Sequence, residues 1–124
     1  QAALVAATFA NEGVMPAPRL VLAVQGRDGT WRSPPRTGPS ARQVLRPADA
    51  QAQLAAWPRH PGGMAAHWGT AVAGRGQPQH AWFIGVGGLG QVERVAVAVL
   101  IEHAAQPEDA PSIGTALLQA ALER

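Results

Sequence analysis

The stretch Ala66-His67-Trp68-Gly69-Thr70-Ala71 is followed, after a segment rich in Gly and Pro, by His80-Ala81-Trp82-Phe83-Ile84-Gly85. Short runs of small, β-branched and aromatic residues on either side of turn-forming residues are typical of neighbouring antiparallel strands. We therefore expect strands at Ala65–Val72 and Ala81–Val86.

A third strand is expected at Arg94–Glu102, where apolar residues alternate without interruption. Two sets of side chains would face opposite ways: Val95, Val97, Val99 and Ile101 in one, and Ala96, Ala98 and Leu100 in the other. Because both sets are apolar, this segment is predicted to be a central strand covered on both sides. The three segments together predict one antiparallel sheet.

Further elements are expected before this sheet. An Ala-rich segment predicts a helix at Ala2–Ala10, and Gly13 supplies the left-handed residue that helix ends prefer. A short apolar strand is expected at Leu20–Val24, with a weak return strand beginning at Trp31. Pro47 then opens a second helix that continues through Trp57.

The chain closes with a predicted helix at Ile113–Glu123, capped by Ser112. Its apolar stripe is expected to pack on the sheet through Leu117 and Leu118. The whole order of elements predicts an α+β fold, in which an antiparallel β-sheet is flanked by helices.

Composition narrows the classes of function. The chain has 124 residues, of which 47% are hydrophobic and 15% charged, as in a globular domain or a piece of one. All ten basic residues are Arg and they are scattered along the sequence, so no nucleic-acid partner is expected. The absence of Cys excludes disulfides and thiolate metal sites. The first residue is Gln1 and not Met, from which we expect further sequence upstream.

Two other patterns have a chemical and a structural interpretation. Gly85-Val86-Gly87-Gly88-Leu89-Gly90 matches the GxGxxG spacing of dinucleotide sites, but a strand and not a helix is expected next, which favours a hairpin turn. The four histidines have no metal-ligand spacing, although His67 and His80 could approach across neighbouring strands. We expect no metal and no cofactor. Trp82, in an apolar strand, is expected in the core.

These residues together resemble the C-terminal part of the transpeptidase domain of class B penicillin-binding proteins, which is related to the serine β-lactamases. The family pattern runs Lys-Thr-Gly-Thr-Ala, a turn, then His-Ala-Trp-Phe-x-Gly. Phe9-Ala10-Asn11-Glu12-Gly13 and Val44-Leu45-Arg46-Pro47 resemble its Phe-Ala-Asn-Gly-Gly and Val-Leu-Ser-Pro passages. The resemblance implies a partial transpeptidase (β-lactamase-like) fold, with residues 1–124 forming one segment of such a domain.

The resemblance also implies which chemistry is absent. In the family a Ser of a Ser-x-x-Lys motif is acylated by a peptidoglycan stem peptide or by penicillin, and the Lys activates its hydroxyl. This chain has no Lys and no Ser-x-Asn, so no catalytic residue is expected in it. His67 and Trp68 stand at the Lys and Thr of the third motif. With Gly69 and Thr70 they form the expected substrate groove, a degenerate Lys-Thr-Gly strand.

Partners and location follow from the same resemblance. A stem peptide or β-lactam would bind only together with the missing half of the domain. The segment is expected to self-associate or to join the rest of its domain, with Trp68 in the contact. Its parent would be anchored in the cytoplasmic membrane and would act in the cell envelope. Two alternatives stay open: a non-catalytic module that binds cell-wall or division proteins, and a working enzyme with its Ser-x-x-Lys elsewhere and His67 in place of Lys.

Overall fold

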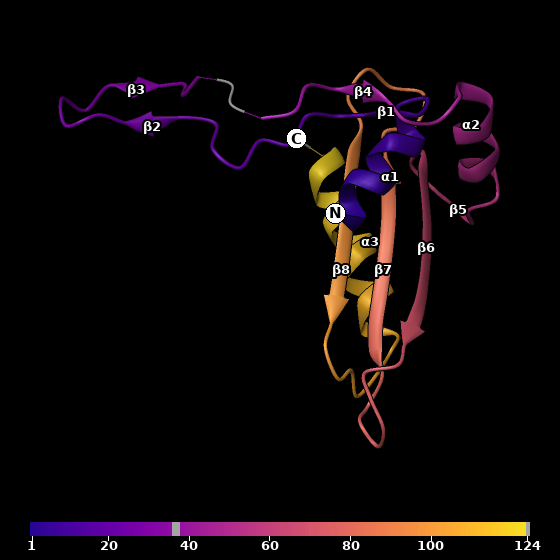
Figure 1. Ribbon diagram of the computed structural model, residues 1–124. Helices are drawn as coiled ribbons and strands as arrows, with labels where there is room; N and C mark the ends of the chain where they lie inside the picture. Colours follow the sequence, from indigo (N-terminus) through magenta and orange to yellow (C-terminus); the bar gives the residue numbers. More distant parts are fainter. Residues whose placement is uncertain (36–37, 124) are drawn as a thin grey trace.

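The computed structural model describes residues 1–35 and 38–123. Within them lie α1 (Ala2–Ala10), α2 (Pro47–Ala55) and α3 (Asp109–Leu122). The main strands are β6 (Met64–Ala71), β7 (His80–Gly87) and β8 (Val95–Ile101), and five two-residue strands complete the set: β1 (Val14–Met15), β2 (Val24–Gln25), β3 (Trp31–Arg32), β4 (Arg42–Gln43) and β5 (Arg59–His60). The predicted α+β class is confirmed, as Figure 1 shows.

The main sheet is antiparallel and has the strand order β5-β6-β7-β8. The predicted sheet of three long strands is therefore confirmed, but the prediction that the third strand is central is wrong, because β8 lies at an edge. Its side chains are apolar on both faces for another reason. Helix α1 packs on one face of β7 and β8, and α3 packs on the opposite face (Figure 1).

The core between α3 and the sheet is built around Phe83, which is 1% exposed. Helix α3 approaches closely because Gly114 lies against the Phe83 ring and Gly85 lies under Leu118. The segment Gly85–Gly90 continues from β7 into the turn before β8, so the expected hairpin is confirmed.

Two details of α3 differ from the sequence prediction. The helix begins at Asp109, after Glu108 as its N-cap, so Ser112 lies inside the first turn and is not the cap. Pro111 is tolerated there because first-turn N–H groups have no partner within the helix. Leu118 is buried as predicted, but Leu117 is 48% exposed, because a step of one residue rotates a side chain by about 100° around the axis.

Helix α1 packs on the other face of the sheet through Ala6 and Ala10, in a cluster with Val86 and Leu54. The rings of Phe9 and Trp57 meet edge to face, with centroids 5.8 Å apart, and this joins α1 to the chain just after α2. The second helix was predicted to continue through Trp57, but α2 ends at Ala55.

Residues 17–35 and 38–41 form an arm that projects away from the sheet and its helices (Figure 1). The predicted strand Leu20–Val24 is wrong, because only Val24–Gln25 forms a strand, paired with Trp31–Arg32. Leu20 is fully exposed, since no second layer lies against this segment to bury it. The turn of the arm is held by Asp28, and hydrogen bonds from the Thr30 hydroxyl and N–H lower the pKa of its carboxyl group.

Candidate functional site

The outer edge of β6 carries the four residues predicted to form a groove, His67, Trp68, Gly69 and Thr70. Strand β5 pairs only with Met64 and Ala65, and the Ala66 N–H donates to the Pro58 carbonyl at 3.1 Å. No strand of the described residues pairs with the outer edge beyond that point.

The Ala66 N–H points outward, and because backbone groups alternate along a strand, the N–H and C=O of Trp68 and Thr70 point outward as well. The edge therefore offers a short row of donors and acceptors to an added extended chain.

The pairing between β6 and β7 places the side chains of the four residues on two faces of the sheet. His67 lies opposite Ile84, on the face covered in part by α1, and Trp68 lies opposite Phe83, on the face of α3. Trp68 is 47% exposed. The structure thus brings the four residues together along one edge but divides their side chains. The expected contact of Trp68 with another chain or lobe stays a prediction.

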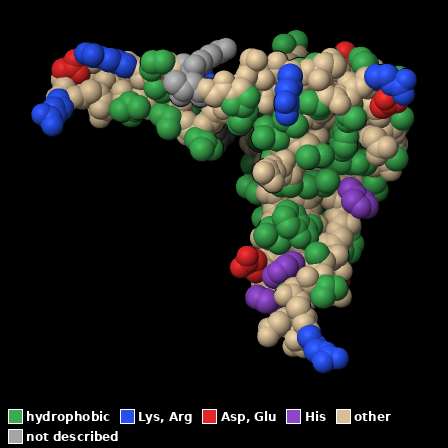
Figure 2. All heavy atoms as spheres, in the orientation of Figure 1, with side chains coloured by type: hydrophobic (Ala, Val, Ile, Leu, Met, Phe, Trp, Pro, Cys, Tyr) green, Lys and Arg blue, Asp and Glu red, His purple; other side chains and the backbone are tan. Residues whose placement is uncertain are grey.

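Trp82 also lies near the outer part of β6, beside Gly69, and the sequence prediction did not include it in the site. It was expected in the core, but it is 36% exposed, with Gly69 on one side and Leu100 on the other as cross-strand neighbours. Helix α1 is too short to cover this part of the sheet. His80, Trp82 and Ile84 alternate with the buried residues Ala81 and Phe83, and this alternation indicated that Trp82 lies on the opposite face from Phe83. Figure 2 shows hydrophobic side chains gathered over this face of the sheet and along the arm.

The histidines do not meet as the sequence suggested. His67 pairs with Ile84 whereas His80 pairs with Ala71, so they lie four residues apart along the sheet. His80 meets His103 instead: their ring centroids are 5.0 Å apart, and the His103 N–H donates to Nδ1 of His80 at 3.1 Å. No three His, Asp or Glu side chains gather as a metal site in the part of the chain that the structure describes.

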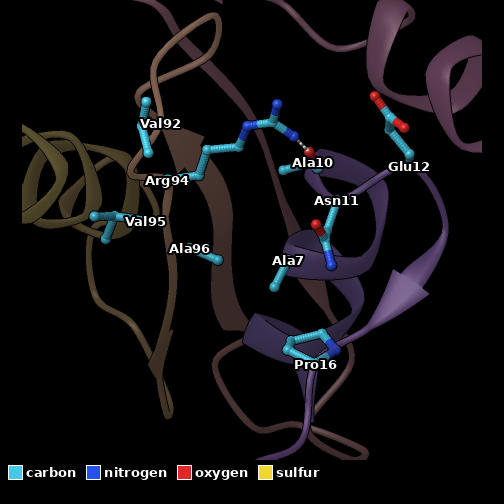
Figure 3. Close-up of a pocket in the computed structure, with 9 residues that line it drawn as sticks. All are labelled: Ala7, Ala10, Asn11, Glu12, Pro16, Val92, Arg94, Val95 and Ala96. Atoms are coloured by element: carbon cyan, nitrogen blue, oxygen red, sulfur yellow. Dashed lines mark hydrogen bonds between the residues drawn. The ribbon is translucent and has the colours of Figure 1, made fainter. Parts of the chain in front are cut away.

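A hollow of about 500 Å³ lies between the end of α1 and the start of β8 (Figure 3). Asn11 and Glu12 line one side, and Val95 and Ala96 line the other. The guanidinium group of Arg94 reaches across and donates to the carbonyl of Ala10. This places a cation at the C-terminal end of α1, where the helix dipole is negative and where the last turn has no basic residue of its own.

We expect Arg94→Ala to lower the free energy of unfolding by about 1–2 kcal/mol, because a charged hydrogen bond and a favourable helix-dipole interaction are lost. Arg75→Ala, in the exposed turn between β6 and β7, is the matched control and should change stability by less than about 0.5 kcal/mol. Urea denaturation followed by circular dichroism measures both. Equal losses in the two variants would contradict the assigned role of Arg94.

None of the helices in the described residues is both long enough and apolar enough to cross a membrane.

Comparison with known proteins gives a single line of evidence for relationship. No family model matches the sequence, and no curated protein matches it. The crystal structure of PBPA from Mycobacterium tuberculosis is similar, with a TM-score of 0.62 and 26% sequence identity. The match covers 97% of this chain but 30% of the PBPA chain. The predicted resemblance is thus confirmed at the level of the fold: this chain is structurally similar to one part of a penicillin-binding protein.

Proposed function

We propose that this chain is a section of a transpeptidase-type penicillin-binding domain, in which β6 forms one wall of the groove for a peptidoglycan stem peptide or a β-lactam. It acts in the cell envelope as part of a membrane-anchored protein. The chain supplies the sheet and the edge that holds the ligand backbone, and the nucleophile comes from a complementary segment. The 124 residues contain no Lys, so none of their Ser residues has a Ser-x-x-Lys base.

The open edge of β6 is the observation that carries this proposal. An extended peptide laid beside it would pair with the outward backbone groups of Trp68 and Thr70, as in strand addition. His67 and Gly69 lie at the same stretch on the α1 side. The similarity to PBPA supports this assignment, since the match covers 97% of this chain.

Two further surfaces are suited to the complementary segment. The outer edge of β8 has no partner strand among the described residues, although the strand is apolar on both faces. Beside it, Trp82 and Leu100 form an exposed apolar patch on the α1 side. Unpaired edges and apolar patches of this kind are where further polypeptide docks.

A non-catalytic binding module for cell-wall or division proteins is the second candidate. Trp68 favours it, because a large exposed ring replaces the small hydroxyl residue of the family motif. The sequence of the complete protein distinguishes the two candidates. Ser-x-x-Lys and Ser-x-Asn motifs there would support the proposed function, and their absence from the whole protein would favour the binding module.

The 124-residue chain alone should form no covalent adduct with a labelled β-lactam, because no hydroxyl in it has a Lys base. Intact mass spectrometry measures this directly. A stoichiometric acyl adduct would contradict the proposal that the nucleophile lies outside this chain.

In a protein that joins these residues to Ser-x-x-Lys and Ser-x-Asn motifs, acylation by a labelled β-lactam should occur and should depend on the β6 edge. Thr70→Pro removes an outward N–H at a position where an edge strand tolerates proline, so the second-order acylation rate should fall at least about tenfold. Thr70→Val keeps the N–H and is the matched control. An equal loss in both variants would show that the Thr70 backbone does not hold the ligand.

A further inference from the structure

The positive and negative charges of this chain are concentrated in different segments of its sequence, and the fold places these segments apart. Residues 16–46 contain six Arg and one acidic residue, Asp28; Arg32 is paired with Asp28, and Arg46 is paired with Asp49. Residues 102–124 contain four carboxylates, Glu102, Glu108, Asp109 and Glu123, and one basic residue, Arg124. The first segment contains the arm, and the second contains α3, so a basic element and an acidic element are separate parts of the folded chain (Figure 1).

The arm exposes several large apolar side chains to solvent. Its exposed large side chains, with their exposed fractions, are Leu20 100%, Val21 51%, Leu22 70%, Val24 54% and Trp31 68%. Strands β2 and β3 have only two residues each and pack chiefly on each other. Such a short two-stranded ribbon is at best marginally stable in water, and its exposed leucines would gain from burial. The arm therefore has the properties of an element that docks.

A flat lipid surface fits this arm poorly. The pairing places Val24 and Arg32 on one face of the hairpin, and Gln25 and Trp31 on the other. The turn between them is polar and contains Arg27 and Asp28, so it is not an apolar tip for insertion. A planar bilayer would cover one of the two faces, whereas a protein surface can reach around both.

Helix α3 offers a complementary surface in the same chain. Asp109, Ile113 and Leu117 follow one another at intervals of four residues, so they lie in one row along the helix. Ile113 is 46% exposed and Leu117 is 48% exposed, whereas Gly114 and Leu118 face the sheet. The row is an apolar ridge with a carboxylate at its start.

The arm carries a hollow suited to such a ridge. Its volume is about 870 Å³, and its apolar lining includes Leu20, Val21, Val24, Pro34 and Pro39. Because the arm projects away from its own sheet and helices, it does not cover its own α3 (Figure 1). A second copy of the chain can supply the ridge to the hollow.

We propose that two copies of this chain form a two-fold dimer in which the arm of each packs on α3 of the other. Leu20 and its neighbours in the arm cover Ile113 and Leu117, and Arg19 and Arg27 of the arm lie near the carboxylates of the partner's α3. The contact is made twice, once in each direction, as two-fold symmetry requires. It leaves the β6 edge and the β8 edge free, so it does not depend on the proposed function.

Sedimentation equilibrium of the full chain tests the dimer. We expect a monomer–dimer equilibrium whose Kd rises with salt, because part of the attraction is between exposed charges. Leu20→Ser and Leu117→Ser should each raise the Kd by about tenfold or more, as loss of a buried apolar anchor does. Val92→Ser changes a fully exposed residue outside both surfaces and should leave the Kd unchanged. A monomer at all concentrations, or a dimer that persists in both variants, would overturn the proposal.

Cysteine cross-linking tests the arrangement, and the natural chain contains no Cys to interfere. Chains carrying Leu20→Cys are mixed with chains carrying Leu117→Cys and oxidised briefly. We expect the mixed disulfide to form faster than either symmetric one, and faster than the pair of Leu20→Cys with Val92→Cys. Symmetric Leu20→Cys dimers as the main product would place two arms together, and would overturn the packing of arm on α3.

Discussion

Gly114→Ala is expected to destabilise this protein by about 3 kcal/mol or more, although the same change inside a helix usually stabilises it by about 1 kcal/mol. A Cβ added at Gly114 would lie well inside van der Waals distance of the Phe83 ring. Phe83 is 1% exposed and is held between the sheet and α3, so the ring has no free space into which it can turn. Helix α3 would have to move away from β7. Thermal and urea denaturation of the full chain measure the loss.

A double-mutant cycle distinguishes this clash from a general sensitivity of α3. Phe83→Ala alone should cost about 3–5 kcal/mol, because it leaves a cavity. In that background Gly114→Ala should have a small effect or a favourable one, since the obstructing ring is gone. Additive losses in the double variant would show that Gly114 is required for a reason other than the approach of the ring.

Gly13→Ala is expected to cost about 3 kcal/mol, from two causes that act at one residue. Gly13 has a φ of 83°, in the left-handed region, and a Cβ there would collide with the carbonyl oxygen of Leu45. The N–H of Gly13 donates to the Thr8 carbonyl at 2.9 Å, and its own carbonyl accepts from the N–H of Val44 at 3.0 Å. The residue therefore ends α1 and joins it to the chain before α2.

Gly90→Ala is the matched control for Gly13. Gly90 has a φ of 87°, and nothing lies within 4 Å of the place where its Cβ would be. Its substitution should cost only the conformational penalty of a left-handed Ala, about 1–2 kcal/mol. The difference between the two losses measures the collision with Leu45, and a difference near zero would show that α1 can shift to accommodate it.

Local pattern was enough to predict the three long strands of the main sheet, although not that β8 lies at its edge. Short runs of small, β-branched and aromatic residues predicted β6 and β7, and alternation predicted β8. Gly13 was correctly predicted as the left-handed residue after α1. These features depend on residues close together in the chain, so no knowledge of distant contacts was required. The resemblance to a penicillin-binding protein rested on the same segments, in the same order.

The candidate site was predicted only in part. The sequence placed His67, Trp68, Gly69 and Thr70 on one strand, but the register with β7 decided that His67 and Trp68 face opposite sides. The free outer edge follows from the shortness of β5, and the exposure of Trp82 follows from the shortness of α1. The lengths of β5 and α1 are set by segments distant from β6 in the sequence. The sequence of β6 alone therefore did not determine what lies beside it.

The sequence by itself determined the three helices and the three long strands, because backbone sterics and the spacing of apolar residues act over a few residues. Tertiary structure alone decided that β8 is an edge strand, that Leu117 is exposed beside the buried Leu118, and that Leu20–Val24 belongs to a projecting arm. In each case an apolar residue is compatible with several environments. Which one it occupies depends on whether a distant segment packs against it, since burial is a property of the assembled layers and not of the residue.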